Sequence, residues 1–233
     1  CVPLGPQVVA GPVFWPMTQA PEVLRFYRDW VADAPDELMT IVINRKAPPL
    51  PFVPSELHGK PVVVVACCWA GDIEEGERVI RPLKAFGSPV LDVCVPKSFL
   101  THQAMFDPSF PKGRWYYFKS CDVAELSDDI IDITVEHCLQ ISSPLTSFPI
   151  WQRGGAVGRV GEDETAFSGR SAGFTYNIGA STETSEGFAE EREWVRNFWS
   201  ALRPWHEGVY VNFLGDEGAE RVGAPDLEAP ALL

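Results

Sequence analysis

The sequence predicts an α+β fold in which helices pack on one face of a large, mainly antiparallel β-sheet. Strand-like and helix-like segments alternate through the first two thirds of the chain, and strand-like segments become denser in the last third. Strands that follow one another along a chain favour antiparallel pairing with the helices gathered on one side. The 233 residues are 45% hydrophobic and 22% charged, which is typical of a globular chain with a substantial core.

The first two thirds of the chain alternate between the two patterns. Runs of β-branched or alternating apolar residues predict strands at 8–14, 38–43, 62–69, 91–95 and 114–119. Apolar residues at helical spacing predict helices at 21–34, 73–86, 97–106 and 130–139. Pro21 suits the first turn of its helix, Ser127 is a good N-cap, and Pro82 is expected to kink the second helix. Residues 44–60 contain four prolines and no periodicity, so we expect a loop there.

The last third is richer in strand patterns, which fall at 145–152, 156–160, 174–180 and 209–214. An amphipathic helix is predicted at 190–202, and Pro204 ends it. The pattern gives way to Ala, Pro and Leu after Gly223. We therefore expect one domain over residues 1–221 and a tail over 222–233.

The acidic composition argues against two classes of partner. The net charge of −13 comes from 32 acidic and 19 basic residues. Nucleic acid and anionic membrane surfaces both attract clustered Lys and Arg, so we expect neither as a partner. The longest apolar run is about half of what a bilayer crossing needs.

The cysteines and histidines do not have the spacing of metal ligands. The six cysteines include no C-x-x-C pair, and the four histidines are scattered. We therefore predict no metal site, and we expect buried, reduced thiols in a cytoplasmic protein. The chain begins at Cys1 and enters strand-like sequence at once, so we expect it to be a fragment of a longer protein.

Three local motifs resemble catalytic or binding motifs but lack the necessary context. Residues 169–173 match the G-x-S-x-G motif of serine hydrolases, but the sequence predicts a strand after them where such hydrolases have a helix. The glycine-rich segment 154–158 lacks the Gly-Lys-Ser/Thr ending of a phosphate loop. The carboxylates of 162–164 share one turn, whereas glycosidase carboxylates face each other across a cleft. We interpret residues 169–173 as a loop, residues 154–158 as the entry to a strand and residues 162–164 as a solvent-exposed turn.

Aromatic residues are concentrated in the predicted strands: Trp115, Tyr116, Tyr117, Trp151, Phe174, Tyr176, Tyr210 and Phe213. Alternation places only about half of them on one face of the sheet. Core packing can explain any single one of them. A sheet face lined by several aromatic side chains could also hold a planar ligand.

Eight short stretches, taken in order, resemble the substrate domain and C-terminal segment of the berberine-bridge-enzyme-like, FAD-linked oxidases, which are VAO/PCMH-type flavoproteins. They are Ala70-Gly71 with Glu74-Glu75-Gly76-Glu77; Pro82-Leu83 with Phe86-Gly87; Gln103 with Phe106-Asp107; RWYYFKS at 114–120; Ser143-Pro144; Gly154-Gly155-Ala156-Val157; Thr165-Ala166-Phe167 with Arg170; and Tyr210-Val211-Asn212. The family's C-terminal segment would correspond to about 190–221.

The resemblance implies a large antiparallel sheet that covers the flavin ring held by a separate, N-terminal domain. It implies oxidation of a small organic substrate by hydride transfer to FAD, with oxygen as acceptor. We expect the N-terminal FAD-binding domain to be absent from this chain. The chain alone is then expected to bind no FAD and to be inactive, and a flavin-binding domain becomes its expected partner, in cis or in trans.

The resemblance also indicates site residues. Tyr210 and Asn212 are expected nearest the flavin. A substrate wall is expected from Tyr117, Lys119, Trp151, Gln152 and Phe213. Many relatives have a catalytic tyrosine where this chain has Phe213, which cannot accept a proton. The catalytic base is therefore unassigned.

A second class of function stays open at this point. The chain could be a non-catalytic α+β module that binds an aromatic ligand or a partner protein, because it lacks every cofactor-holding motif. Under the oxidase hypothesis, the sheet face that covers the flavin would be apolar and exposed in this chain. We therefore expect self-association through that face.

Overall fold

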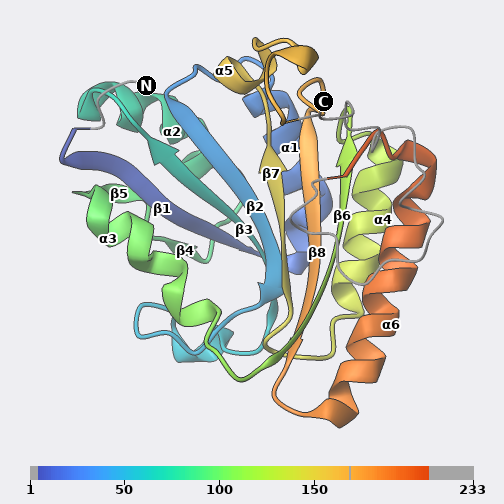
Figure 1. Ribbon diagram of the computed structural model, residues 1–233. Coiled ribbons are helices and arrows are strands. Elements are labelled where there is room, and N and C mark those ends of the chain that lie inside the picture. Colours follow the sequence, from blue (N-terminus) through green and yellow to red (C-terminus); the bar gives the residue numbers. More distant parts are fainter. Residues whose placement is uncertain (1–4, 168, 210–233) are drawn as a thin grey trace.

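The computed structural model describes residues 5–167 and 169–209, which form one eight-stranded sheet with the four longest helices packed on one face (Figure 1). The strands are β1 (Gln7–Pro16), β2 (Leu38–Lys46), β3 (Pro61–Trp69), β4 (Leu91–Asp92), β5 (Val95–Ser98), β6 (Trp115–Val123), β7 (Ser147–Gln152) and β8 (Phe174–Thr182). They lie in the order β4-β1-β3-β2-β7-β8-β6, and β5 also pairs with β1. All these pairs are antiparallel, so the predicted fold class is confirmed.

Helices α1 (Ala20–Val31), α2 (Ile73–Ala85), α4 (Asp128–Leu139) and α6 (Ser185–Leu202) cover one face of the sheet, which we call the helix face (Figure 1). Local sequence sets their ends. Pro21 lies in the first turn of α1, and the Asp72 and Ser127 side chains accept hydrogen bonds from the first turns of α2 and α4. Pro82 lies inside α2, which continues to Ala85.

The main core lies between the sheet and these helices. Trp15 of β1 and Tyr176 of β8 pack with Leu24 of α1 and Phe198 of α6, and all four side chains are buried. Burying each such side chain stabilises the fold by roughly 1.5–3 kcal/mol. Alternation along the strands then sends every second residue to the opposite face, which we call the second face.

The second face is covered over β1, β3 and β2. The loop that contains Leu50 and Val53 packs on Phe14 and Val64, and Phe99 of helix α3 (Phe99–Gln103) packs on β1. A 3₁₀ segment, η3 (Ala104–Ser109), continues from α3. Over β8 the second face carries small and polar residues, namely Thr175, Asn177, Gly179 and Ser181.

The structure corrects four predicted segments. The strand predicted at 156–160 is the one-turn helix α5 (Gly155–Gly158) and a turn, because Gly154 and Gly155 take φ values of 141° and 53° that redirect the backbone. The strand predicted at 91–95 is split into β4 and β5, and both pair with β1.

The other two corrections concern helix boundaries. The helix predicted at 97–106 begins only at Phe99, after β5, and ends in η3. The helix predicted at 190–202 begins earlier, at Ser185. The predicted loop at 44–60 holds the end of β2 and a 3₁₀ turn, η2 (Ser55–Leu57). The predicted strand at 209–214 lies outside the described residues apart from its first position.

Five cysteines of the described ranges are buried free thiols, as the sequence predicted: Cys67, Cys68, Cys94, Cys121 and Cys138. Within residues 5–167 and 169–209, no group of three or more metal-ligating side chains converges. The helices in the same ranges are too short or too polar to cross a bilayer.

Candidate functional site

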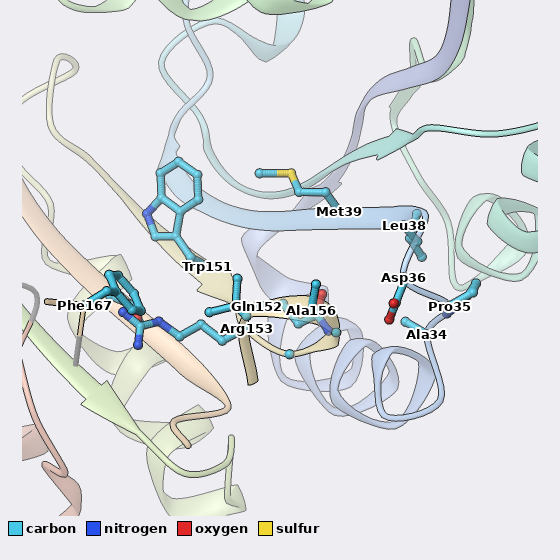
Figure 2. Close-up of a pocket in the computed structure, with 14 residues that line it drawn as sticks. Ala34, Pro35, Asp36, Leu38, Met39, Trp151, Gln152, Arg153, Ala156 and Phe167 are labelled. Atoms are coloured by element: carbon cyan, nitrogen blue, oxygen red, sulfur yellow. The ribbon is translucent and has the colours of Figure 1, made fainter. Parts of the chain in front are cut away.

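A cavity of about 630 Å³ lies at the end of the sheet where β2 begins and β7 ends (Figure 2). Its walls come from the α1–β2 turn, the first residues of β2, the end of β7, α5 and Phe167. The lining residues are Ala34, Pro35, Asp36, Leu38, Met39, Trp151, Gln152, Arg153, Gly154, Gly155, Ala156, Val157, Phe167 and Thr175. Segments more than a hundred positions apart in the chain therefore form one cavity.

Pairing between β2 and β7 brings these segments together. Ile41 of β2 pairs with Trp151 of β7, so Leu38 and Met39 lie just beyond the end of the ladder. Trp151 projects from the second face, beside Met39, and Gln152 projects toward the helix face (Figure 2). The cavity wall therefore includes side chains from both faces at this end of the sheet.

A hydrogen-bonded chain from the core orients Gln152. The Tyr27 hydroxyl lies 2.8 Å from Thr40 Oγ1, and Thr40 donates to Gln152 Oε1 at 3.4 Å. Because the Thr40 proton goes to Gln152, Tyr27 is the donor to Thr40. Burial raises the pKa of the Tyr27 phenol, so the phenol stays protonated and keeps donating. The amide nitrogen of Gln152, a residue that lines the cavity, takes no part in this chain of hydrogen bonds.

Both charged residues of the cavity wall are paired. Asp36 accepts hydrogen bonds from both terminal nitrogens of Arg159, and this contact lowers the pKa of the Asp36 carboxyl. Arg153 lies 3.6 Å from the buried carboxylate of Asp122 and donates to the backbone carbonyl of Gly169. The cavity wall therefore carries no unbalanced charge.

The loop after α5 is held by backbone contacts to one carboxylate. Glu162 accepts hydrogen bonds from the backbone N–H groups of Gly169, Arg170 and Ser171. Phe167 packs under the guanidinium groups of Arg153 and Arg170, each 5.0 Å from the ring centre. This loop leads directly into β8, so the G-x-S-x-G motif does not form a strand–turn–helix elbow.

The predicted substrate wall is brought together only in part. Trp151 and Gln152 line the cavity. Tyr117 and Lys119 lie elsewhere, on the helix face, where they pair with Ala180 and Ile178 of the core. The Lys119 ammonium group lies 4.5 Å from the centre of the Trp199 ring of α6, and the Tyr117 hydroxyl accepts a hydrogen bond from Arg196.

Three predicted site residues, Tyr210, Asn212 and Phe213, lie outside the described residues. The chain reaches the edge of β6 just before them, because Gly208 forms a bridge with Asp122. Sequence reasoning missed Asp36, Met39 and Arg153 as cavity residues. The one available signal was that Arg153 directly follows Trp151 and Gln152 in the chain.

The comparisons with known proteins point to flavoproteins, although no family model matches the chain. The chain is 26% identical over 226 residues to the uncharacterised FAD-linked oxidoreductase YgaK of Bacillus subtilis, covering 95% of this chain and 45% of that protein. It is 23% identical over 152 residues to an FAD-linked oxidoreductase of Dictyostelium discoideum, covering 64% of this chain and 34% of the relative. The chain thus spans less than half the length of these curated relatives.

Solved structures share the fold over nearly the whole chain. The 6-hydroxy-D-nicotine oxidase of Arthrobacter nicotinovorans superposes with a TM-score of 0.73 at 17% identity, covering 97% of this chain and 50% of that one. The BBE-like 1 protein of Physcomitrella patens gives a TM-score of 0.74 at 14% identity, covering 94% of this chain and 49% of its own. GilR, an oxidoreductase of gilvocarcin biosynthesis, gives a TM-score of 0.71 at 16% identity, covering 90% of this chain and 47% of that one.

The glycine-rich turn of this chain does not fit the pyrophosphate of a whole FAD. The start of a substantial helix, where backbone N–H groups point outward, is a favourable site for a pyrophosphate. The glycine-rich turn of this chain opens α5, which has four residues, and a Cβ on Gly155 would lie 3.0 Å from the Asp36 carboxylate. A carboxylate at this point would repel a phosphate.

The chain superposes on about half of the length of these flavoproteins, and the sequence similarity points to the same group. The chain therefore has the fold of the substrate-binding half of the FAD-linked oxidases and resembles the berberine-bridge-enzyme-like members of that group.

Proposed function

We propose that this chain is the substrate-binding part of an FAD-dependent oxidoreductase that oxidises a small organic substrate. In this proposal residues 1–221 form the substrate-binding domain, and a flavin-binding domain, in the same polypeptide or in another, holds the FAD. When bound, the flavin would accept a hydride from a substrate carbon, and oxygen would be the final acceptor. The observation that carries the proposal is a cavity of about 630 Å³ with aromatic walls, built into the fold that these oxidases share.

The residues of this chain would bind and orient the substrate. Trp151 and Phe167 supply flat apolar walls, and Gln152 supplies a hydrogen-bond donor. By resemblance, Tyr210 and Asn212 would lie nearest the flavin. Phe213, in the position of the usual tyrosine, could exclude water from the reacting carbon but could not take its proton.

A chimera with the relative from Bacillus subtilis tests the proposal. This chain would replace the segment of that protein that it matches, and the remainder would supply the flavin-binding residues. We expect the chimera to purify with bound flavin, and iodide to quench its flavin fluorescence several-fold less than that of the remainder alone. Anaerobic addition of substrates from a panel of sugars, phenols and cyclic amines should bleach the flavin in at least one case.

One control and one contradicting result define the outcome. This chain purified alone should be colourless, because its glycine-rich turn does not fit the FAD pyrophosphate. A chimera that is folded by circular dichroism but leaves its flavin as open to iodide as in the remainder alone would contradict the proposal. That result would favour a module that binds its ligand without any flavin.

A further inference from the structure

We propose that the cavity takes an uncharged, planar aromatic molecule of two or three rings that carries a hydrogen-bond acceptor, and that Gln152 donates to that acceptor. The inference rests on the proposed function only in naming this molecule the substrate. Binding itself requires no flavin, so the chain as it stands can be tested.

The shape and the apolar lining of the cavity suit a flat ring system. Trp151 and Met39 lie along one side, and Phe167 lies toward one end (Figure 2). Aromatic rings and thioethers contact the faces and edges of aromatic ligands favourably. A volume of about 630 Å³ falls within the range of roughly 300–1,000 Å³ that holds molecules of this size.

The charges around the cavity favour a neutral molecule. Of its two charged lining residues, Asp36 pairs with Arg159 and Arg153 pairs with Asp122. An anion would have to compete with Asp122 for Arg153, whose side chain is only 10% exposed. A cation would have to displace Arg159 from Asp36. Either would bury a charge without a free partner, which is costly.

The scarcity of free polar groups argues against a sugar. The Thr175 hydroxyl already donates to Asp122 at 2.6 Å. The Asp36 carboxylate and the Arg153 guanidinium are already engaged. A sugar would therefore bring several hydroxyl groups into a cavity that could pair few of them, and buried unpaired polar groups weaken binding.

The Trp151 indole N–H also has no hydrogen-bond partner within the described part of the chain, but that nitrogen is shut off from solvent. The remaining polar side-chain group of the cavity wall is the Gln152 amide, and it is held as a donor. Its Oε1 accepts from Thr40, which Tyr27 fixes from the core. Among the hydrogen bonds of residues 5–167 and 169–209, none involves Gln152 Nε2. A carbonyl oxygen or ring nitrogen on the ligand would match this nitrogen. Tyr27 and Thr40 act as positioning residues, because they reach the ligand only through Gln152.

Three naphthalene probes of similar size test separately whether the ligand needs a hydrogen-bond acceptor and whether it must be uncharged. Isothermal titration calorimetry on this chain should detect acetylnaphthalene, whose carbonyl is an acceptor. Isopropylnaphthalene, which lacks the acceptor, should bind about three- to tenfold more weakly. Naphthoate should bind at least tenfold more weakly, and glucose should not bind.

Variants test the role of Gln152. Gln152→Glu keeps the shape but removes the donor, and it should reduce affinity for acetylnaphthalene while leaving isopropylnaphthalene binding nearly unchanged. Tyr27→Phe should also reduce the affinity for acetylnaphthalene. Tyr176→Phe is the matched control, because Tyr176 is also fully buried and hydrogen-bonded to a threonine, Thr134, but does not contact the Gln152 chain.

Several results would overturn the inference. Naphthoate or glucose binding as tightly as acetylnaphthalene would reject a neutral aromatic ligand. Equal affinity for the acetyl and isopropyl probes, unchanged in Gln152→Glu, would reject the donor. Binding of acetylnaphthalene without flavin shielding in the chimera would support the cavity and contradict the oxidase function. Flavin shielding in the chimera without binding of acetylnaphthalene would support the oxidase function and contradict the ligand proposed for the cavity.

Discussion

Arg159 donates hydrogen bonds to both carboxylate oxygens of Asp36, 123 positions earlier in the chain, and so ties α5 to the turn between α1 and β2. Both side chains are about half exposed or more, so the pair adds little to global stability. Its main effect is local, because α5 forms one wall of the cavity.

Replacing Asp36 with Asn should therefore change the melting temperature very little but loosen α5. We expect faster amide hydrogen exchange in residues 155–159 and weaker binding of acetylnaphthalene. Asp132→Asn is the control, since it breaks another exposed pair, to Arg25 at 3.0 Å, away from the cavity. Equal exchange at α5 in the two variants would contradict this role of the Asp36–Arg159 pair.

Lowering the pH should break the Asp36–Arg159 ion pair over a defined pH range. Arg159 lowers the pKa of the Asp36 carboxyl below its ordinary value of 3.8. A group with a lowered pKa contributes stability at pH values above its ordinary pKa, and this stability is lost as the pH falls below that pKa. Exchange at α5, corrected for its intrinsic pH dependence, should be the same at pH 7 and pH 5 and should rise below about pH 3.8.

Tyr27→Phe and Tyr176→Phe should each lower the free energy of unfolding by about 1–2 kcal/mol, because each leaves a buried threonine hydroxyl without its tyrosine partner. Urea denaturation followed by circular dichroism measures both. The two partners, Thr40 and Thr134, are equally buried. A loss below about 0.3 kcal/mol for Tyr27→Phe would mean that the Thr40 contact does not hold in solution.

Stability should fall at alkaline pH for a related reason. Burial raises the pKa of Tyr27 and Tyr176 above the ordinary value of 10.0. A raised pKa gives stability that is fully present below the unfolded value and is lost as the pH rises above it, by about 1.4 kcal/mol per pH unit for each group. Burial of the Cys138 thiol raises its pKa above 9.0, so some loss should begin earlier. The double variant Tyr27→Phe, Tyr176→Phe should flatten the slope above pH 10 in urea titrations.

Two helical glycines should respond to alanine in opposite ways. A Cβ on Gly76 in α2 would lie 2.3 Å from the Trp69 ring, which is held by a hydrogen bond to Asp72. Gly76→Ala should therefore cost about 1–2 kcal/mol despite its better helix propensity. A Cβ on Gly187 in α6 would meet only ordinary contacts at 3.7 Å, so Gly187→Ala should stabilise by about 0.5–1 kcal/mol. Thermal denaturation of the pair checks the difference in sign.

Self-association should depend on the second face of the sheet. Phe110 is 55% exposed and contacts Tyr116 on that face. If a flavin-binding domain normally covers the face, the chain alone should dimerise at high concentration, and Phe110→Lys should reduce dimerisation in sedimentation velocity. Leu139→Lys is the control, since Leu139 is 62% exposed at the end of α4. A monomer at all concentrations would contradict this expectation.

Much of the fold could be predicted because local pattern and tertiary position agree in the core strands. The β-branched run in β3 is flanked by strands on both sides, and its burial explains why it is apolar throughout. The segment after Gly155 misled the prediction. Ala156 and Val157 alternate like strand residues, but the positive φ angles of the two preceding glycines cannot be inferred from hydrophobicity.

The candidate site was predictable only in part. Trp151 and Gln152, which line the cavity, were predicted for the substrate wall because they combine aromatic and polar character at a strand end. Tyr117 and Lys119 were placed beside them because a pattern of alternation cannot say which set of residues faces the helices, and a shift by one position changes the face. Asp36 and Phe167 come from connections whose spatial neighbours depend on strand order, which the sequence does not reveal.

The described sheet divides into two groups of strands, one from residues 7–98 and one from residues 115–182, and within the sheet the five residue pairs between β2 and β7 join them. The cavity lies at the end of this seam. A bound molecule would brace the two groups against separation, so its binding energy would add to the cohesion of the whole chain. Loss of the seam would abolish the cavity even if each group kept its own strands intact.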